Sequence, residues 1–169
     1  TSPLPTSYPR MPFLDLLTSE RVRTDLVVAD KTELLAEISS LLADDSGNGS
    51  DIREALLARE RLGSTGLGRG VAIPHGRIPG IEKARAVFIK LQMPVDFGAV
   101  DAEPVDLIAG LIVPAHFTDQ HLHLLAELAE MFSNDQLTTA LRQADNGSVM
   151  ITEMAEFAGN RLRESAWTD

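Results

Sequence analysis

The chain has 169 residues, and its 15 basic and 25 acidic residues give a formal net charge of −10 at pH 7. A hydrophobic share of 44% is enough to bury a core, and the length suits one domain. The absence of cysteine excludes disulfides and thiolate metal sites, and the acidic balance argues against nucleic-acid binding. No apolar run reaches the roughly 18 residues of a membrane span. The composition predicts a soluble, cytoplasmic protein without membrane insertion.

The two ends of the chain are predicted to lie outside the folded domain. Four prolines fall within the first 12 residues, where they block regular structure, and no continuous apolar stretch of a signal peptide is present. We therefore expect a flexible leader over residues 1–12, a domain over 13–160 and a tail over 161–169.

Helices and strands are predicted to interleave along the domain. Predicted strands cover residues 21–28, 71–74, 84–92 and 105–113. Asp30 opens a predicted helix, Ser50 or Asp51 caps the next one, Thr118 caps another, and Ser133 and Ser148 begin the last two. The strands over 84–92 and 105–113 are apolar enough for at least one of them to be covered on both faces. This order predicts a single-domain α/β sandwich, with helices packed on a central sheet.

The helix predicted over residues 118–132 presents one of its histidines inward. At 100° per residue, His121 lies at the centre of the arc that contains Leu124 and Leu128, whereas His123 points to the other side. His116 precedes the helix in a loop, so we expect His116 and His123 to be solvated. A core histidine with satisfied hydrogen bonds is the alternative interpretation of His121.

The preceding helix places an arginine on its apolar stripe. Arg59 follows Ile52 and Leu56 at helical spacing, whereas Arg61 faces outward. A guanidinium on a buried face needs a partner because its charge cannot be removed. That partner is either a carboxylate of the protein or an anion that arrives from outside.

The glycine-spaced segment GSTGLGRG, residues 63–70, lies between Arg59 and a strand that ends in Pro74-His75-Gly76. It matches neither the P-loop nor the dinucleotide-binding motif, and alone it is weak evidence. Gly76 allows another backbone to approach His75 closely. An arginine, two hydroxyls, free N–H groups and two histidines together suit a transferable phosphoryl group, because imidazole acts as a nucleophile without a separate base.

Residues 59–77, RERLGSTGLGRGVAIPHGR, strongly resemble the enzyme IIA proteins of the bacterial phosphoenolpyruvate-dependent phosphotransferase system, fructose/mannitol class. The likeness continues through PVDLIAGLIVPA (104–115) and HLHLLAELAEMF (121–132) and covers about residues 13–158. It is most similar to the nitrogen-regulatory branch. The resemblance implies a mixed sheet flanked by helices.

The resemblance also implies a role for each site residue. His75 matches the histidine that accepts the phosphoryl group from a phosphocarrier protein of the HPr or NPr type. His121 matches the second active-site histidine and Arg59 the arginine that neutralises phosphate charge, while Ser64 and Thr65, with Gly66, match the phosphate-binding loop. No cofactor or metal is implied. The expected output is regulation of the nitrogen or potassium type, through protein contacts.

Three other interpretations are open at this point. A sugar-specific enzyme IIA would pass the phosphoryl group to a separate IIB component. A regulatory binding module would carry His75 as a vestige. A metal site would use the four histidines, although helical geometry points some of them away from the others.

Overall fold

The computed structural model describes residues 12–44 and 48–167, with side chains described up to residue 160. Its helices are α1 (Pro12–Asp15), α2 (Lys31–Leu42), α3 (Gly49–Arg61), α4 (Thr118–Phe132), α5 (Asp135–Gln143) and α6 (Gly147–Trp167), with a 3₁₀ turn over Ser19–Arg21. Its strands are β1 (Val22–Leu26), β2 (Gly66–Gly68), β3 (Val71–Ala72), β4 (His75–Ile78), β5 (Arg85–Val95) and β6 (Val105–Pro114).

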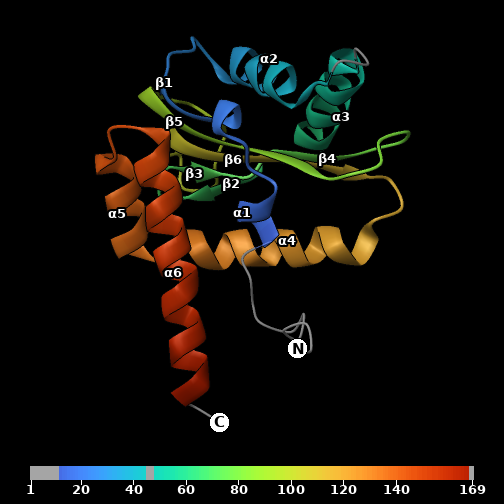
Figure 1. The fold of residues 1–169 in the computed structure, drawn as a ribbon. Coiled ribbons are helices and arrows are strands. Elements are labelled where there is room, and N and C mark those ends of the chain that lie inside the picture. Colours follow the sequence, from blue (N-terminus) through green and yellow to red (C-terminus); the bar gives the residue numbers. More distant parts are fainter. Residues whose placement is uncertain (1–11, 45–47, 168–169) are drawn as a thin grey trace.

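The strands form one mixed sheet. Their order is β1-β5-β6-β3-β2, and β4 pairs with β6 beyond β3. Strands β5 and β6 are antiparallel, whereas β1 runs parallel to β5, and β3 and β4 run parallel to β6. Helices α2 and α3 cover one face of the sheet, and α1, α4 and α6 lie on the other (Figure 1). The predicted α/β sandwich, a mixed sheet flanked by helices, is confirmed.

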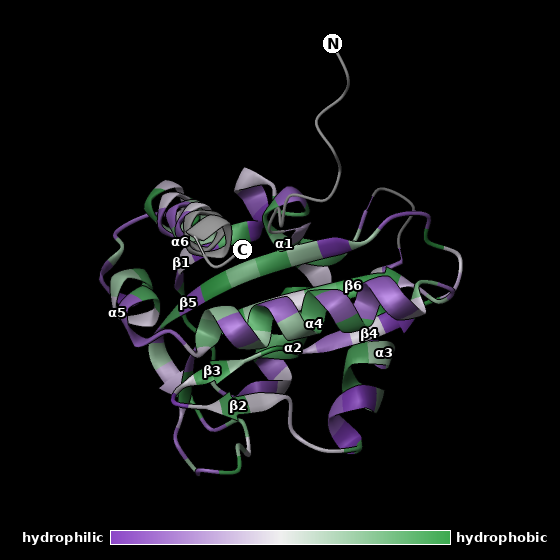
Figure 2. Ribbon diagram, turned by 90° about the horizontal axis from the view of Figure 1, so that it is seen from below, coloured by the Kyte–Doolittle hydropathy of each residue, from purple (hydrophilic) through white to green (hydrophobic). Residues whose placement is uncertain are grey.

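Each face of the sheet carries its own hydrophobic core. In β5, Phe88 packs into the core on the α4–α6 side, while Val87 and Ile89 pack into the core on the side of α2 and α3. Strand β6 divides its side chains in the same way, with Leu111 and Ile112 on opposite faces. Both strands are thus covered on two sides, and Figure 2 shows them as largely hydrophobic.

The predicted start of α2 is confirmed in detail. The Asp30 carboxylate accepts the backbone N–H of Glu33 at 2.9 Å, and the Glu33 carboxylate accepts the N–H of Ala29 at 2.8 Å. These contacts satisfy amide donors that the first turn of a helix leaves unpaired.

Other predicted helix starts differ from the structure by one to three residues. Helix α3 begins at Gly49, before Ser50 and Asp51, and Thr118 is the first residue of α4 rather than its cap. Asn134, not Ser133, caps α5, because its amide oxygen accepts the N–H of Leu137. The Ser133 hydroxyl instead donates to a carbonyl at the end of α4.

Residues 1–11 of the predicted leader lie outside the described residues, and its last residue, Pro12, begins α1. Helix α6 runs without a break across the boundary predicted at residue 160. In the described ranges no helix combines the length and the apolar character needed to cross a membrane.

Candidate active site

Strand β4 carries His75, which is half-buried. Strands β3 and β4 lie one after the other along β6, so His75 begins a second strand segment rather than following the end of a strand. The His75 Nδ1 atom lies 2.7 Å from the carbonyl oxygen of Ile73. Because a carbonyl only accepts, Nδ1 carries the proton in the neutral ring and Nε2 keeps its lone pair.

Gly76, the next residue, brings α3 against this strand. A Cβ atom at this position would lie 3.2 Å from the Cβ of Ala55, which is tighter than ordinary side-chain packing. The absence of that atom lets the helix that carries Arg59 pack on the strand that carries His75. The predicted close approach at Gly76 is confirmed.

Helix α4 supplies His121 from the end of its first turn. The two imidazole rings meet edge to face, with centroids 5.1 Å apart and planes at 72°. His121 Nε2 is buried and has no hydrogen-bond partner among the described residues. Buried polar atoms normally have a partner, so this nitrogen is ready to bind a group that enters the cavity.

Arg59 completes the group. Arg59, His75 and His121 line one cavity of about 500 Å³. The Arg59 Nη1 donates to the carbonyl of Gly63 at 2.9 Å, and no carboxylate of the described residues forms an ion pair with the guanidinium. The structural salt bridge considered from the sequence is therefore not formed, and the guanidinium stays available to an anion.

Burial keeps both imidazoles neutral near pH 7. The pKa of His75 is lowered mainly by burial and further by the positive charge of Arg59, against a raising effect of the Ile73 carbonyl. Burial, with smaller effects of His75 and Arg77, lowers the pKa of His121 to about 4. A neutral His75 has the unprotonated nitrogen that a nucleophile requires.

The structure does not bring the predicted phosphate-binding loop to the cavity. The Ser64 hydroxyl donates to the carbonyl of Phe97 at 2.9 Å and accepts the N–H of Gly66 at 3.0 Å. The buried Thr65 hydroxyl bonds to the Glu60 carboxylate. None of the three loop residues lines the cavity with Arg59, so their contact with phosphate stays a prediction.

Three further residues of this site were not predicted from the sequence. Arg77 lies two positions after His75, and because side chains alternate along a strand, both line the cavity. Leu62 and Leu122 line it as well, with 84% and 63% of their surfaces exposed. Strand periodicity would have indicated Arg77, whereas nothing in the spacing marks these two leucines.

The four-histidine metal site is not assembled. His123 and His116 are exposed and do not line the cavity that holds His75 and His121. The inward placement of His121 and the outward placement of His123 agree with the helical-face prediction.

Known proteins are similar to this chain in sequence. The model of the family described as "Phosphoenolpyruvate-dependent sugar phosphotransferase system, EIIA 2" matches residues 15–156. A nitrogen regulatory protein of Bradyrhizobium diazoefficiens is 36% identical over 146 residues, which cover 86% of this chain and 95% of that protein. The counterpart from Escherichia coli K12 is 38% identical over 146 residues, covering 85% and 90%.

Solved structures of related proteins are similar to this chain in fold. Nitrogen regulatory protein IIA-Ntr from Neisseria meningitidis aligns with a TM-score of 0.81 at 38% identity, covering 84% of this chain and 98% of that chain. The mannitol IIA protein of Escherichia coli, at 21% identity and a TM-score of 0.69, shares the fold; the alignment covers 82% of this chain and 99% of that one. The chain therefore belongs to the EIIA type-2 family of the phosphoenolpyruvate-dependent phosphotransferase system, whose members are phosphotransferases that work through phosphohistidine.

Proposed function

We propose that Nε2 of His75 accepts the phosphoryl group from the phosphohistidine of a phosphocarrier protein. The observation that carries this proposal is the hydrogen bond from His75 Nδ1 to the Ile73 carbonyl, which leaves Nε2 as the free nitrogen of a cavity-lining residue. The Nε2 lone pair attacks phosphorus, the N–P bond of the carrier breaks, and the carrier imidazole leaves with the electron pair. The proton stays on Nδ1, where it is donated to the carbonyl of Ile73, and no proton transfer to or from His75 is needed.

The neighbouring groups stabilise the charge on the transferring group. Its three equatorial oxygens need fixed positive charge and donors. Arg59 supplies the charge, and the unpartnered Nε2 of His121, in the tautomer that carries its proton there, donates a hydrogen bond to a phosphoryl oxygen. Arg77 lines the same cavity and adds a second guanidinium at its opening.

Two exposed leucines that line this cavity are suited to contact a partner protein. Leu62 directly follows α3 and Leu122 lies on α4, and both line the cavity of the histidines. Exposed apolar residues gathered at a functional cavity favour protein contact. The phosphocarrier is the proposed occupant, since its own phosphohistidine must reach His75. A downstream target or separate IIB would use the same face after transfer.

The proposed output is regulation rather than sugar transport. Relatives described as nitrogen regulatory proteins reach 36–38% identity, whereas a fructose-specific EIIA component from Haloferax volcanii is 30% identical over 68% of this chain. We place the protein in the cytoplasm, because phosphoenolpyruvate, which feeds the system named in the family description, is a cytoplasmic metabolite.

Mass spectrometry after incubation with an enzymatically phosphorylated carrier tests the acceptor. The wild type and the His123→Ala control gain one phosphoryl group, and His75→Ala gains none. Labelling of His75→Ala at the wild-type level would reject the assignment. If no carrier labels the wild type while partner binding persists, the chain is a binding module instead.

A further inference from the structure

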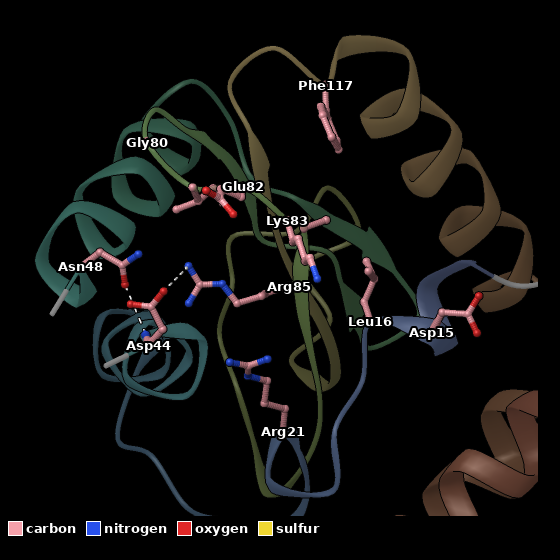
Figure 3. A pocket seen from close by; sticks show the side chains of 12 residues that line it. Asp15, Leu16, Arg21, Asp44, Asn48, Gly80, Glu82, Lys83, Arg85 and Phe117 are labelled. Carbon is pink, nitrogen blue, oxygen red and sulfur yellow. Dashed lines mark hydrogen bonds and ion pairs between the residues drawn. The ribbon is translucent and has the colours of Figure 1, made fainter. Parts of the chain in front are cut away.

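A second cavity, of about 820 Å³, lies away from the histidines. It is bounded by the end of the 3₁₀ turn, the loop after α2, the segment between β4 and β5, and the start of β5 (Figure 3). None of its lining residues lines the cavity of His75. Its volume is in the range of small-molecule sites, which are about 300–1,000 Å³.

Three basic side chains from two parts of the chain line this cavity. Arg21 comes from the 3₁₀ turn, Lys83 from the segment before β5, and Arg85 from β5 itself (Figure 3). Arg85 donates to the carbonyl of Leu42 and pairs with Asp44, at 3.5 Å.

Arg21 is only partly used by the protein. Its Nε donates to the carbonyl of Leu41 at 2.9 Å, which caps the end of α2 together with Arg85. A guanidinium has five N–H donors, and the terminal nitrogens of Arg21 have no partner among the described residues. Helix capping therefore uses Nε of Arg21 and leaves its two terminal nitrogens, Nη1 and Nη2, available to a ligand.

The two guanidinium groups also repel each other. Burial, and next the charge of Arg85, lower the pKa of Arg21, against smaller raising effects of Glu20 and Asp44. Among the carboxylates here, Asp44 pairs with Arg85, and Glu20 and Asp44 both act on Arg21 by their charge. Asp15 and Glu82 line the cavity and form no ion pair with either arginine in the described structure. An anion between Arg21 and Arg85 would remove this repulsion and use the open donors.

The remaining wall is apolar. Leu16, Ile81 and Phe117 line the cavity beside the basic groups. A site with a basic end and an apolar wall suits a ligand that has one anionic group and an apolar part. We propose that this cavity binds a small organic anion, whose single carboxylate or phosphate group is held by Arg21 and Arg85 and whose apolar part lies against Phe117.

Two probes test the proposal on the full ¹⁵N-labelled chain: phenyl phosphate and phenylacetate, followed by amide chemical shifts. We expect saturable shifts at residues 80–85 and around Arg21, and the probe that binds more tightly identifies phosphate or carboxylate as the preferred group. Arg21→Gln weakens binding by about tenfold or more, since charge-assisted hydrogen bonds are lost. Lys83→Gln weakens it by about two- to fivefold, as an exposed charge does.

Matched controls separate this site from the other cavity. Arg23→Gln removes an exposed arginine outside the cavity, and His75→Ala removes the proposed acceptor; both should bind the probes as the wild type does. Shifts confined to residues near His75 and His121, or unchanged affinity in Lys83→Gln and Arg21→Gln, would overturn the proposal. If Arg21→Gln fails to fold, the exposed Lys83→Gln variant decides. The His75→Ala control keeps this result independent of the proposed phosphoryl transfer.

Discussion

The two active-site imidazoles differ in the use of their ring nitrogens. His75 has one nitrogen bonded to a backbone carbonyl, which fixes both its tautomer and the orientation of the ring. The buried Nε2 of His121 has no such bond among the described residues. The first arrangement suits a nucleophile, and the second suits a group that binds the phosphoryl oxygens only during transfer.

Arg59→Gln should slow phosphoryl transfer by about 10²–10³-fold, because fixed positive charge is most effective on a transferring phosphoryl group. The free energy of unfolding should change by less than about 0.5 kcal/mol, since Arg59 has no ion pair to lose. Rapid-quench transfer rates and denaturant titration measure the two effects. Arg61→Gln, on the exposed side of α3, is the control; equal slowing in both variants would contradict the role.

The transfer rate should fall with decreasing pH below neutrality. Protonation removes the lone pair of His75, and burial places its pKa below the ordinary value of about 6.5. The rate is therefore constant above about 6.5 and declines as the pH falls through the lowered pKa. Arg59 contributes to that lowering, so the midpoint in Arg59→Gln should shift upward. Comparing both proteins with one carrier cancels the carrier's own titration, and a midpoint that does not move would contradict the electrostatic account.

Residue spacing predicted the core of the site but not its surroundings. Helical periodicity selected His121 over His123 and Arg59 over Arg61, because each helix has one buried face. The hydroxyls of Ser64 and Thr65 bond to Phe97 and Glu60, and their contact with phosphate stays a prediction. Such bonds join residues 5 and 33 positions apart, and they depend on tertiary packing that no local pattern contains.

At the scale of elements, the loop after α3 is held by a buried ion pair. The Glu60 carboxylate, with 5% of its side chain exposed, pairs with Lys31 at 2.7 Å and accepts both the hydroxyl and the N–H of Thr65. Lys31 also donates to the carbonyl of Phe97 and lies 4.3 Å from the centre of its ring. The loop carries the Gly63 carbonyl that holds Arg59, so the ion pair positions the guanidinium.

Glu60→Gln should lower kcat for transfer by about tenfold while changing KM for the carrier less, because Leu122 on α4 is untouched and the main effect is a looser placement of Arg59. Breaking a buried ion pair also costs about 3–5 kcal/mol of stability, and denaturant titration measures that loss. Rates are therefore compared at temperatures where the variant is folded. The exposed Glu54→Gln on the same helix is the control. A rise in KM without loss of kcat would assign Glu60 to docking instead.

The strands show how far elements can be predicted from sequence. Strands β5 and β6 were predicted within three residues at each end, because their apolar runs are long. The segment over residues 71–78 is divided into β3 and β4, and β2 pairs with β3 across the glycine segment. Short strands of this kind form because β6 offers an edge to pair with, which is a property of the whole sheet.

At the scale of the whole molecule, the two cores have different neighbours. The core on the α4 side lies beneath the helix that carries His121, and Phe132, at the far end of that helix, stacks on Phe88 with ring centroids 6.0 Å apart. His121 and Phe132 lie at opposite ends of α4, so a change in packing at Phe132 lies away from the active-site histidines.

Phe132→Ala should lower the free energy of unfolding by about 3–5 kcal/mol, through loss of burial and formation of a cavity. The side chain is 2% exposed, so the full penalty is expected. The transfer rate per folded molecule should stay near that of the wild type. Denaturant titration and rapid-quench kinetics measure the two quantities. Leu122→Ala, at an exposed site, should give the reverse pattern, with normal stability and weaker carrier docking.

The position of the phosphoryl group on the imidazole tests the account most directly. Long-range ¹H–¹⁵N correlation spectra of the phosphorylated protein, with ³¹P coupling, distinguish the two nitrogens of His75. We expect phosphorus on Nε2 and a proton retained on Nδ1, toward Ile73. Phosphorus on Nδ1, or on another histidine, would contradict the mechanism derived from the Ile73 hydrogen bond.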